Sequence, residues 1–193
     1  MNNFLYIGLD IPNMHLETER LHMVPINWKD VKDLNRLHSI PEVAQFNTLG
    51  IPKNLVETRD HIAPIIEAFA HEEPHKWAWT IRLEPTFAFI GELGMNLSAK
   101  KYKRGEIYYN LLPTYWGQGY ATEAVKALIS FGFESLELHR IEAGVATENL
   151  KSIALLERVG MQREGLHRQI LPIRGGWKDN YSYAVLEGDK RGY

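Results

Sequence analysis

The chain has 193 residues, 45% of them hydrophobic, which is enough to bury one sizeable core but short for two. Its 22 basic and 24 acidic residues leave a net charge of -2, so nothing in the overall charge indicates binding along a phosphate backbone. The absence of cysteine excludes disulfides, thiolate metal ligands and a cysteine nucleophile, and it is compatible with a reducing cytoplasm.

The N-terminal residues 1–15 are expected to form an irregular extension, because Gly8 and Pro12 interrupt any periodicity. They have neither the basic start nor the apolar run of a signal peptide, and no later segment has the roughly 18 apolar residues that a membrane span requires. We therefore expect a soluble, cytoplasmic protein with one domain over residues 16–187 and a short tail over 188–193.

The first elements are predicted from their spacing. Alternation through Leu21 and Met23 predicts a strand, and apolar residues at helical spacing over residues 31–40 predict a helix that a proline ends. A second helix is expected over residues 55–70, where Pro64 should bend it or split it in two.

Three runs rich in aromatic and β-branched residues follow, and the turn residues between them predict an antiparallel meander. The runs are residues 76–84, 86–97 and 104–113. A strongly amphipathic helix comes next, then a strand, another helix and two closing strands. This order predicts an α+β fold in which one strand–helix–strand crossover interrupts an otherwise antiparallel sheet. The crossover helix should pack on the sheet through Ala121, Ala124, Val125, Leu128 and Gly132.

Two glycines, Gly117 and Gly119, stand between the third run and the crossover helix. Unpaired N–H groups at a helix N-terminus attract an anion, and glycine lets the backbone wrap closely around it, which indicates a phosphate ester. A P-loop is excluded, because the lysine that it needs is missing. A dinucleotide fingerprint matches poorly: Thr122 stands at its third small position, although Glu142 lies at about the right distance for its acidic residue. A plain turn without a ligand explains the glycines equally well.

The segments GEIYYNLLPTYWGQGYATEAV, HRIEAGVATENLKSIALLERVGMQREG and GGWKDNYSYAVL, in this order, resemble the GNAT N-acetyltransferase superfamily. Within it they resemble the branch of ribosomal-protein N-terminal acetyltransferases (RimJ/RimL type), and the resemblance runs from TERLHMVPI to about Leu186. It implies the GNAT acyl-CoA N-acyltransferase fold, a mixed, mostly antiparallel sheet of about seven strands flanked by helices. It also implies an acetyl-CoA-dependent N-acetyltransferase without a metal, whose acceptor is a protein N-terminus or a small-molecule amine.

We expect neither a membrane nor a nucleic acid as a direct partner, and either a monomer or a homodimer. A non-catalytic acyl-CoA-binding module on the same fold is the alternative. Such a module would keep Gly117, Gly119 and Asn149 but tolerate the loss of Glu106 and Ser152. Because both of these are present, the enzyme is favoured.

By this resemblance, backbone amides of the glycine loop hold the pyrophosphate of acetyl-CoA, and those of Leu111 and Leu112 pair with its pantetheine arm. Trp116 stands where the family usually has glutamine or arginine. The loop comprises Gly117, Gln118, Gly119, Tyr120, Ala121 and Thr122.

Asn149 and Ser152 match the family's Asn-x-x-Ser signature, in which the serine hydroxyl hydrogen-bonds the departing CoA thiolate. Asn149 is equally a helix N-cap, and Ser152 is equally a small polar residue on the helix surface. Glu106 matches a strand glutamate that serves as the general base in some members, and Glu92 is the second candidate. Either glutamate could instead be an exposed strand carboxylate.

The sequence also predicts which residues lie around the acceptor. Glu106, Tyr108 and Asn110 line one side of the substrate channel if they share a strand face. The four expected acceptor contacts are Glu92, Tyr108, His167 and Trp177. The pattern His-Glu-x-x-His at residues 71–75 is not expected to bind zinc, because Pro74 disrupts the continuous helix that this motif needs.

Overall fold

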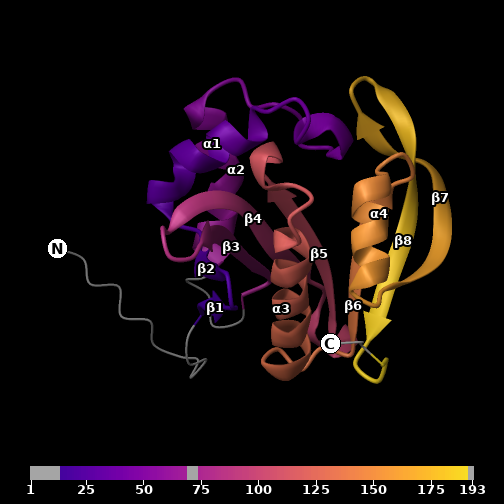
Figure 1. Cartoon of the computed structure of the whole chain (residues 1–193). Coiled ribbons are helices and arrows are strands. Elements are labelled where there is room, and N and C mark those ends of the chain that lie inside the picture. The colour runs from indigo at the N-terminus through magenta and orange to yellow at the C-terminus, as the bar shows by residue number, and fades with distance from the viewer. Residues whose placement is uncertain (1–13, 69–73, 191–193) are drawn as a thin grey trace.

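The computed structural model describes residues 14–68 and 74–190 (Figure 1). Their elements follow the predicted order. The helices are α1 (Val31–His38), α2 (Leu55–Ala68), α3 (Tyr120–Glu134) and α4 (Leu150–Arg158). The strands are β1 (Leu16–Glu17), β2 (Leu21–Pro25), β3 (Lys76–Leu83), β4 (Ala88–Leu97), β5 (Arg104–Leu111), β6 (Arg140–Ala146), β7 (Gln162–Ile173) and β8 (Gly176–Leu186).

All eight strands join one mixed sheet in the order β1-β2-β3-β4-β5-β6-β8-β7. The predicted meander is β3, β4 and β5, which pair antiparallel. The predicted crossover is β5–α3–β6, whose two strands are parallel neighbours. The α+β fold class is thereby confirmed. The two-residue strand β1, too short to show in a hydrophobic pattern, brings the sheet to eight strands.

The helices cover both faces of the sheet, and α3 and α4 lie on the near face in Figure 1. Residues of α3 and α4 belong to the larger apolar cluster, together with Trp79, Leu93 and Ile141. Residues of α1 and α2 belong to a second cluster, which includes Ala78 and Phe89. The sheet is therefore a central layer between two helical layers, in agreement with the continuous burial of residues along β3 and β4.

The apolar face predicted for the crossover helix is confirmed in α3. Ala124, Val125 and Leu128 are fully buried, and Ala121 lies partly buried at the edge of the same cluster. Helical periodicity identified this face because every one of its positions packs on the sheet.

The second predicted helix is α2, and Pro64 lies inside one continuous helix from Leu55 to Ala68, so that of the two expected outcomes, a bend or a split, the split is ruled out. Ile62 and Ile65, on either side of the proline, are buried in the second apolar cluster, and this packing offsets the lost backbone hydrogen bond. The predicted last turn of this helix and most of the His-Glu-x-x-His pattern lie in residues 69–73, outside the described residues. In the described part of the chain, no helix has the length and apolar character needed to cross a membrane.

Candidate active site

Strands β5 and β6 pair only over a short stretch and then separate. Arg104–Glu106 of β5 lie beside Arg140–Glu142 of β6, and beyond them β5 pairs with β4 alone and β6 with β8 alone. The opening lies at the carboxyl ends of two parallel strands, which is where α/β sheets bind ligands. Backbone N–H and C=O groups face it from both strands without a strand partner, so an extended ligand can hydrogen-bond to either edge.

The two amides predicted to pair with pantetheine have different positions. The Leu112 amide donates to the Ile90 carbonyl at 2.9 Å, so the sheet already uses it. In an antiparallel pair, the amides of successive residues point alternately toward the partner strand and away from it. The Leu112 amide points toward β4, so the Leu111 amide points away from β4 and toward the opening. The Leu111 carbonyl accepts a hydrogen bond from Trp116 Nε1 at 2.8 Å. Of the predicted pair, only the Leu111 amide is left for a ligand.

The glycine loop joins β5 to α3 at the mouth of this opening. Gly117 and Gly119 have φ values of 73° and 84°, in the left-handed region that favours glycine. Gly119 is the N-cap of α3, and no side chain of the described residues caps the helix. The Gln118 side chain folds back to donate to the Thr114 carbonyl at 2.8 Å. The first-turn N–H groups of α3 are thus left to an anion, as the loop pattern predicts.

Helix α4 begins on the other side of the opening. Asn149 Oδ1 accepts a hydrogen bond from the Ser152 amide at 3.2 Å, so Asn149 has the capping contact that the sequence allowed. The Ser152 side chain faces β5: burial raises the pKa of Tyr109 to about 12, although a hydrogen bond with Ser152 acts in the opposite direction. Ser152 and Tyr109 therefore approach each other from opposite sides of the opening.

A buried polar cluster lies on the other face of the sheet, toward α1 and α2. Glu92 on β4 and His38 at the end of α1 are only 4% and 2% exposed. Glu92 Oε1 lies 2.6 Å from His38 Nε2 and accepts a hydrogen bond from Asn110 Nδ2 at 3.0 Å. Glu92 Oε2 receives no hydrogen bond from any residue that the structure describes. A buried carboxylate oxygen without a partner is costly, so Oε2 is a candidate acceptor for a ligand N–H or O–H group.

The cluster carries an ion pair. Burial alone would lower the pKa of His38, but the hydrogen bond and the charge of Glu92 outweigh it and raise that pKa above its ordinary value. Burial would likewise raise the pKa of Glu92, but His38 and Asn110 hold it below its ordinary value. Burial, and then the charge of His38, lower the pKa of the neighbouring His61. Glu92 is therefore ionised, and His61 stays neutral near pH 7.

The ion pair predicts a pH dependence of stability. Its contribution is complete between the ordinary pKa of a glutamate, about 4.3, and that of a histidine, about 6.5, and the His38 part is lost as pH rises through the raised pKa. We expect the melting temperature of the wild type, measured relative to His38→Gln, to fall between about pH 6 and pH 9. Calorimetric melts of both proteins across this range test the expectation. A constant difference would contradict the charged state assigned to His38.

Tyr108 shares the face of Asn110, as predicted, and its ring lies across Gly94. A β-carbon at position 94 would come within 2.4 Å of Tyr108 Cζ, so glycine is needed for this approach. Burial, and then the charge of Glu92, raise the pKa of Tyr108 above its ordinary value, so it remains a neutral phenol. The predicted acceptor contacts Glu92 and Tyr108 are thus brought together.

Glu106 occupies a different environment, although alternation puts it on the same strand face as Tyr108 and Asn110. It is exposed, and it lies beside Glu142 in the part of β5 that still pairs with β6. Asn110 is four positions further along the strand, a distance of about 13 Å in an extended chain. Glu106 therefore lies before the opening begins, whereas Glu92 lies opposite Asn110 alongside it.

His167 and Trp177 lie farther along the sheet. His167 is exposed on β7 opposite Asn180 of β8, so β8 and β6 lie between it and the opening. Trp177 is 64% exposed near the turn from β7 to β8. Arg174 in that turn donates to the Pro41 carbonyl at 2.8 Å, which brings the hairpin against the segment after α1. Their contact with the acceptor remains a prediction for both residues.

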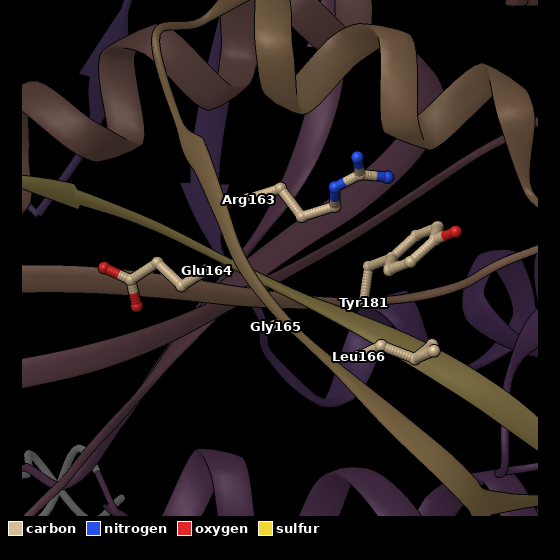
Figure 2. Close-up of a pocket in the computed structure, with 5 residues that line it drawn as sticks. All are labelled: Arg163, Glu164, Gly165, Leu166 and Tyr181. Atoms are coloured by element: carbon tan, nitrogen blue, oxygen red, sulfur yellow. The ribbon is translucent and has the colours of Figure 1, made fainter.

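A shallow depression of about 330 Å³ lies on β7 and β8, lined by Arg163, Glu164, Gly165, Leu166 and Tyr181 (Figure 2). The Arg163 guanidinium lies 4.6 Å from the centre of the Tyr181 ring. Glu164 points the other way (Figure 2). None of the predicted site residues lines this depression, and we do not take it as the active site.

Sequence reasoning missed three residues of the site. His38 ends a predicted helix, and no pattern marks it as the partner of Glu92. Tyr109 lies in a predicted strand, and nothing in its sequence context marks it as the partner of Ser152. Arg20 belongs to the TERL segment that carried part of the resemblance, but its contact with the glycine loop depends on tertiary structure.

The sheet opening, the uncapped glycine loop and the facing start of α4 belong to one α+β domain, and their shape and chemistry suit an extended phosphorylated ligand. The family model described as "Acetyltransferase (GNAT) domain" matches residues 20–162 of the chain. The uncharacterized N-acetyltransferase p20 of Bacillus licheniformis is 34% identical over 177 residues, which cover 92% of this chain and 98% of p20. The chain belongs to the GNAT acetyltransferase family, and it is an N-acetyltransferase.

Solved structures agree. A GNAT-family acetyltransferase from Bacillus anthracis has a TM-score of 0.79 at 27% identity, covering 91% of this chain and 100% of that one. RimJ of Mycobacterium smegmatis, in complex with CoA-disulfide, has a TM-score of 0.77 at 23% identity, covering 86% of this chain and 82% of that one. The resemblance to the GNAT superfamily is confirmed, and RimJ-type proteins are among the structures that share the fold.

Proposed function

We propose that this N-acetyltransferase moves an acetyl group from acetyl-CoA to a weakly basic primary amine, namely the α-amine of a protein or peptide N-terminus or a small-molecule amine of similar basicity. The loop at Gly117–Gly119 would bind the pyrophosphate through its amides, and the Leu111 amide would pair with the pantetheine arm. Ser152, facing the opening from α4, would lie beside the thiol. These positions suit a ligand that runs from the mouth of α3 into the sheet opening.

Relatives leave the acceptor open between two classes. The [ribosomal protein uS5]-alanine N-acetyltransferase of Escherichia coli is 32% identical over 81 residues, 42% of this chain and 42% of that protein. The spermidine N-acetyltransferase of Vibrio cholerae, solved with CoA and spermine, shares the fold with a TM-score of 0.79 at 18% identity, covering 88% of this chain and 97% of that one. The choice for this chain therefore depends on its own residues.

The observation that carries the proposal is the buried oxygen Glu92 Oε2. His38 and Asn110 engage the other oxygen and fix the orientation of the carboxylate, which leaves Oε2 as an acceptor without a donor among the described residues. An amine about to attack a thioester has an N–H to donate, and it must lose a proton during the reaction. Glu92 would accept that proton, either directly or through one water.

The acetyl transfer is proposed to proceed by direct attack of the amine on the thioester. The neutral amine nitrogen forms a bond to the acetyl carbonyl carbon, the carbon–sulfur bond breaks, and the electron pair leaves with the CoA sulfur. The proton lost by the nitrogen goes to Glu92. The Ser152 hydroxyl hydrogen-bonds the sulfur as its negative charge develops, and the thiol forms when a proton reaches it from solvent. Ser152 thus stabilises charge that is larger in the transition state than in the substrate.

The basicity of the acceptor follows from the electrostatics of this pair. An α-amine has a pKa of about 7.7 to 8.0 and a lysine side chain about 10.4, so at pH 7 the neutral form costs about 1 kcal/mol for the first and about 4.6 kcal/mol for the second. Because His38 and Asn110 lower the pKa of Glu92, it is a weak base. A weak base suits an amine whose neutral form costs only about 1 kcal/mol at pH 7.

A single peptide tests this preference. We expect a peptide with a free α-amine and one internal lysine to be acetylated mainly on the α-amine at pH 7, with spermidine as the comparison acceptor. Fragmentation mass spectrometry locates the acetyl group, and a peptide whose α-amine is blocked is the control. Acetyl-lysine as the dominant product would contradict the proposed acceptor class.

A further inference from the structure

One side chain from a distant part of the sequence reaches the N-terminus of α3. Arg20 lies in the turn between β1 and β2, and its Nε donates to Glu123 Oε2 at 2.7 Å. Its Nη1 donates to the Gln118 carbonyl at 3.1 Å. The guanidinium carbon lies 4.5 Å from the centre of the Tyr120 ring. Arg20 thus touches both the glycine loop and the first turn of the helix that follows it.

Glu123 is the acidic partner of this contact, and it is ionised. Its carboxylate accepts hydrogen bonds from the Thr18 hydroxyl at 2.6 Å and from the Arg20 amide at 3.0 Å. Burial raises the pKa of Glu123, but these hydrogen bonds and those of the guanidinium outweigh it and leave the pKa below its ordinary value. A fixed negative charge therefore sits in the first turn of α3, where the proposed function requires a phosphate to bind.

The two charges act oppositely on such a phosphate. An uncompensated carboxylate near a helix N-terminus competes with an anionic ligand for the positive end of the helix dipole and repels it. The Arg20 guanidinium, 42% exposed, cancels that charge from the side of the loop. It lies against the loop itself: a β-carbon on Gly119 would be 3.3 Å from Arg20 Nη2.

We propose that Arg20 is a positioning residue of the CoA site: it neutralises Glu123 and holds the Gln118 carbonyl, so that the loop amides stay directed at the pyrophosphate. This inference rests on the proposed use of acetyl-CoA. Arginine suits the role better than lysine, because only its planar fork reaches the carboxylate and the carbonyl together. Lys151, whose Nζ lies 4.7 Å from the centre of the Trp116 ring, is a second cation close to the loop.

Three variants test the charge relation by calorimetric titration with acetyl-CoA. We expect Arg20→Ala to weaken binding about tenfold, because it leaves the charge of Glu123 uncompensated beside the bound phosphate. Glu123→Gln should bind at least as tightly as the wild type, since it leaves the Arg20 cation uncompensated. The double variant should bind more tightly than Arg20→Ala alone. At saturating acetyl-CoA the turnover number of Arg20→Ala should match the wild type, so that the change appears in KM.

Arg36→Ala is the matched control. Arg36 is also exposed, pairs with Asp33, and lies 5.9 Å from the centre of the Phe89 ring, but on α1. Its removal should leave acetyl-CoA binding unchanged, and thermal melts of every variant verify folding. Unchanged binding in Arg20→Ala, or a double variant no tighter than Arg20→Ala, would overturn the inference while wild-type binding persists. A wild type that does not bind acetyl-CoA would instead overturn the proposed function.

Discussion

Replacing Gly119 with valine should weaken acetyl-CoA binding about 100-fold, equivalent to losing two charge-assisted hydrogen bonds of about 1.5 kcal/mol each. Gly119 has a φ of 84°, which a β-branched side chain adopts only under strain. Its β-carbon would also lie 3.3 Å from Arg20 Nη2, so the branched methyl groups must displace the arginine or the loop. Either movement turns the loop amides away from the phosphate.

Gly175→Val is the matched control for this loss. Gly175, in the turn from β7 to β8, has a similar φ of 75° and open space around its β-carbon position. It should suffer comparable backbone strain while retaining acetyl-CoA affinity. Calorimetric titration of both variants, with melting temperatures measured in parallel, separates strain from lost ligand contacts. Wild-type affinity in a folded Gly119→Val protein would show that this loop does not hold the pyrophosphate.

The second large effect concerns the proton acceptor. We expect Glu92→Gln to lower kcat/KM by about 100- to 10,000-fold, the range for loss of a general base. Glu106→Gln is the same substitution on the same face of the sheet, but at an exposed position of the neighbouring strand. It should change kcat/KM by no more than about twofold, because surface changes usually have small effects. Initial rates with a peptide acceptor at saturating acetyl-CoA measure both effects.

The effect of Glu92→Gln on folding stability must be measured separately from its effect on the reaction, because this substitution leaves the buried His38 without its counter-charge. Breaking a buried pair on one side costs about 3–5 kcal/mol, whereas removing both charges is often nearly neutral. The double variant with His38→Gln should therefore recover the melting temperature without recovering the rate. If Glu106→Gln loses the activity and Glu92→Gln keeps it, the base is Glu106, the residue that the family resemblance first indicated.

The sequence predicted the fold well where local pattern and tertiary packing agree. The crossover helix was identifiable because each residue of its apolar face, such as Val125 and Leu128, packs on the sheet. The sequence could not exclude a split at Pro64, because the local cost of the proline is offset by burial of its neighbours, which the local sequence does not show. Strand β1 was missed because two residues carry no periodicity.

The conformation of the glycine loop was predictable for the same reason, since the left-handed glycines at Gly117 and Gly119 follow from local backbone geometry. The side-chain contacts around this loop and at the sheet opening could not be predicted from the sequence. Glu92 meets a histidine 54 positions away, and Arg20 meets a glutamate 103 positions away. The alternation of side chains along the strand puts Glu106 and Asn110 on one face. The point at which β5 and β6 separate depends on sheet pairing, which the local sequence does not show. This point of separation decides which of the two glutamates lies alongside the opening.

Release of free CoA thiol from acetyl-CoA, followed on mixing the protein with a peptide whose α-amine is free, tests the central claim most directly. The proposed transfer predicts thiol release in proportion to the peptide that gains an acetyl group, and none when the α-amine is already acetylated. Tight binding of acetyl-CoA without thiol release, for α-amine peptides and small amines alike, would contradict acetyl transfer and leave an acyl-CoA-binding module.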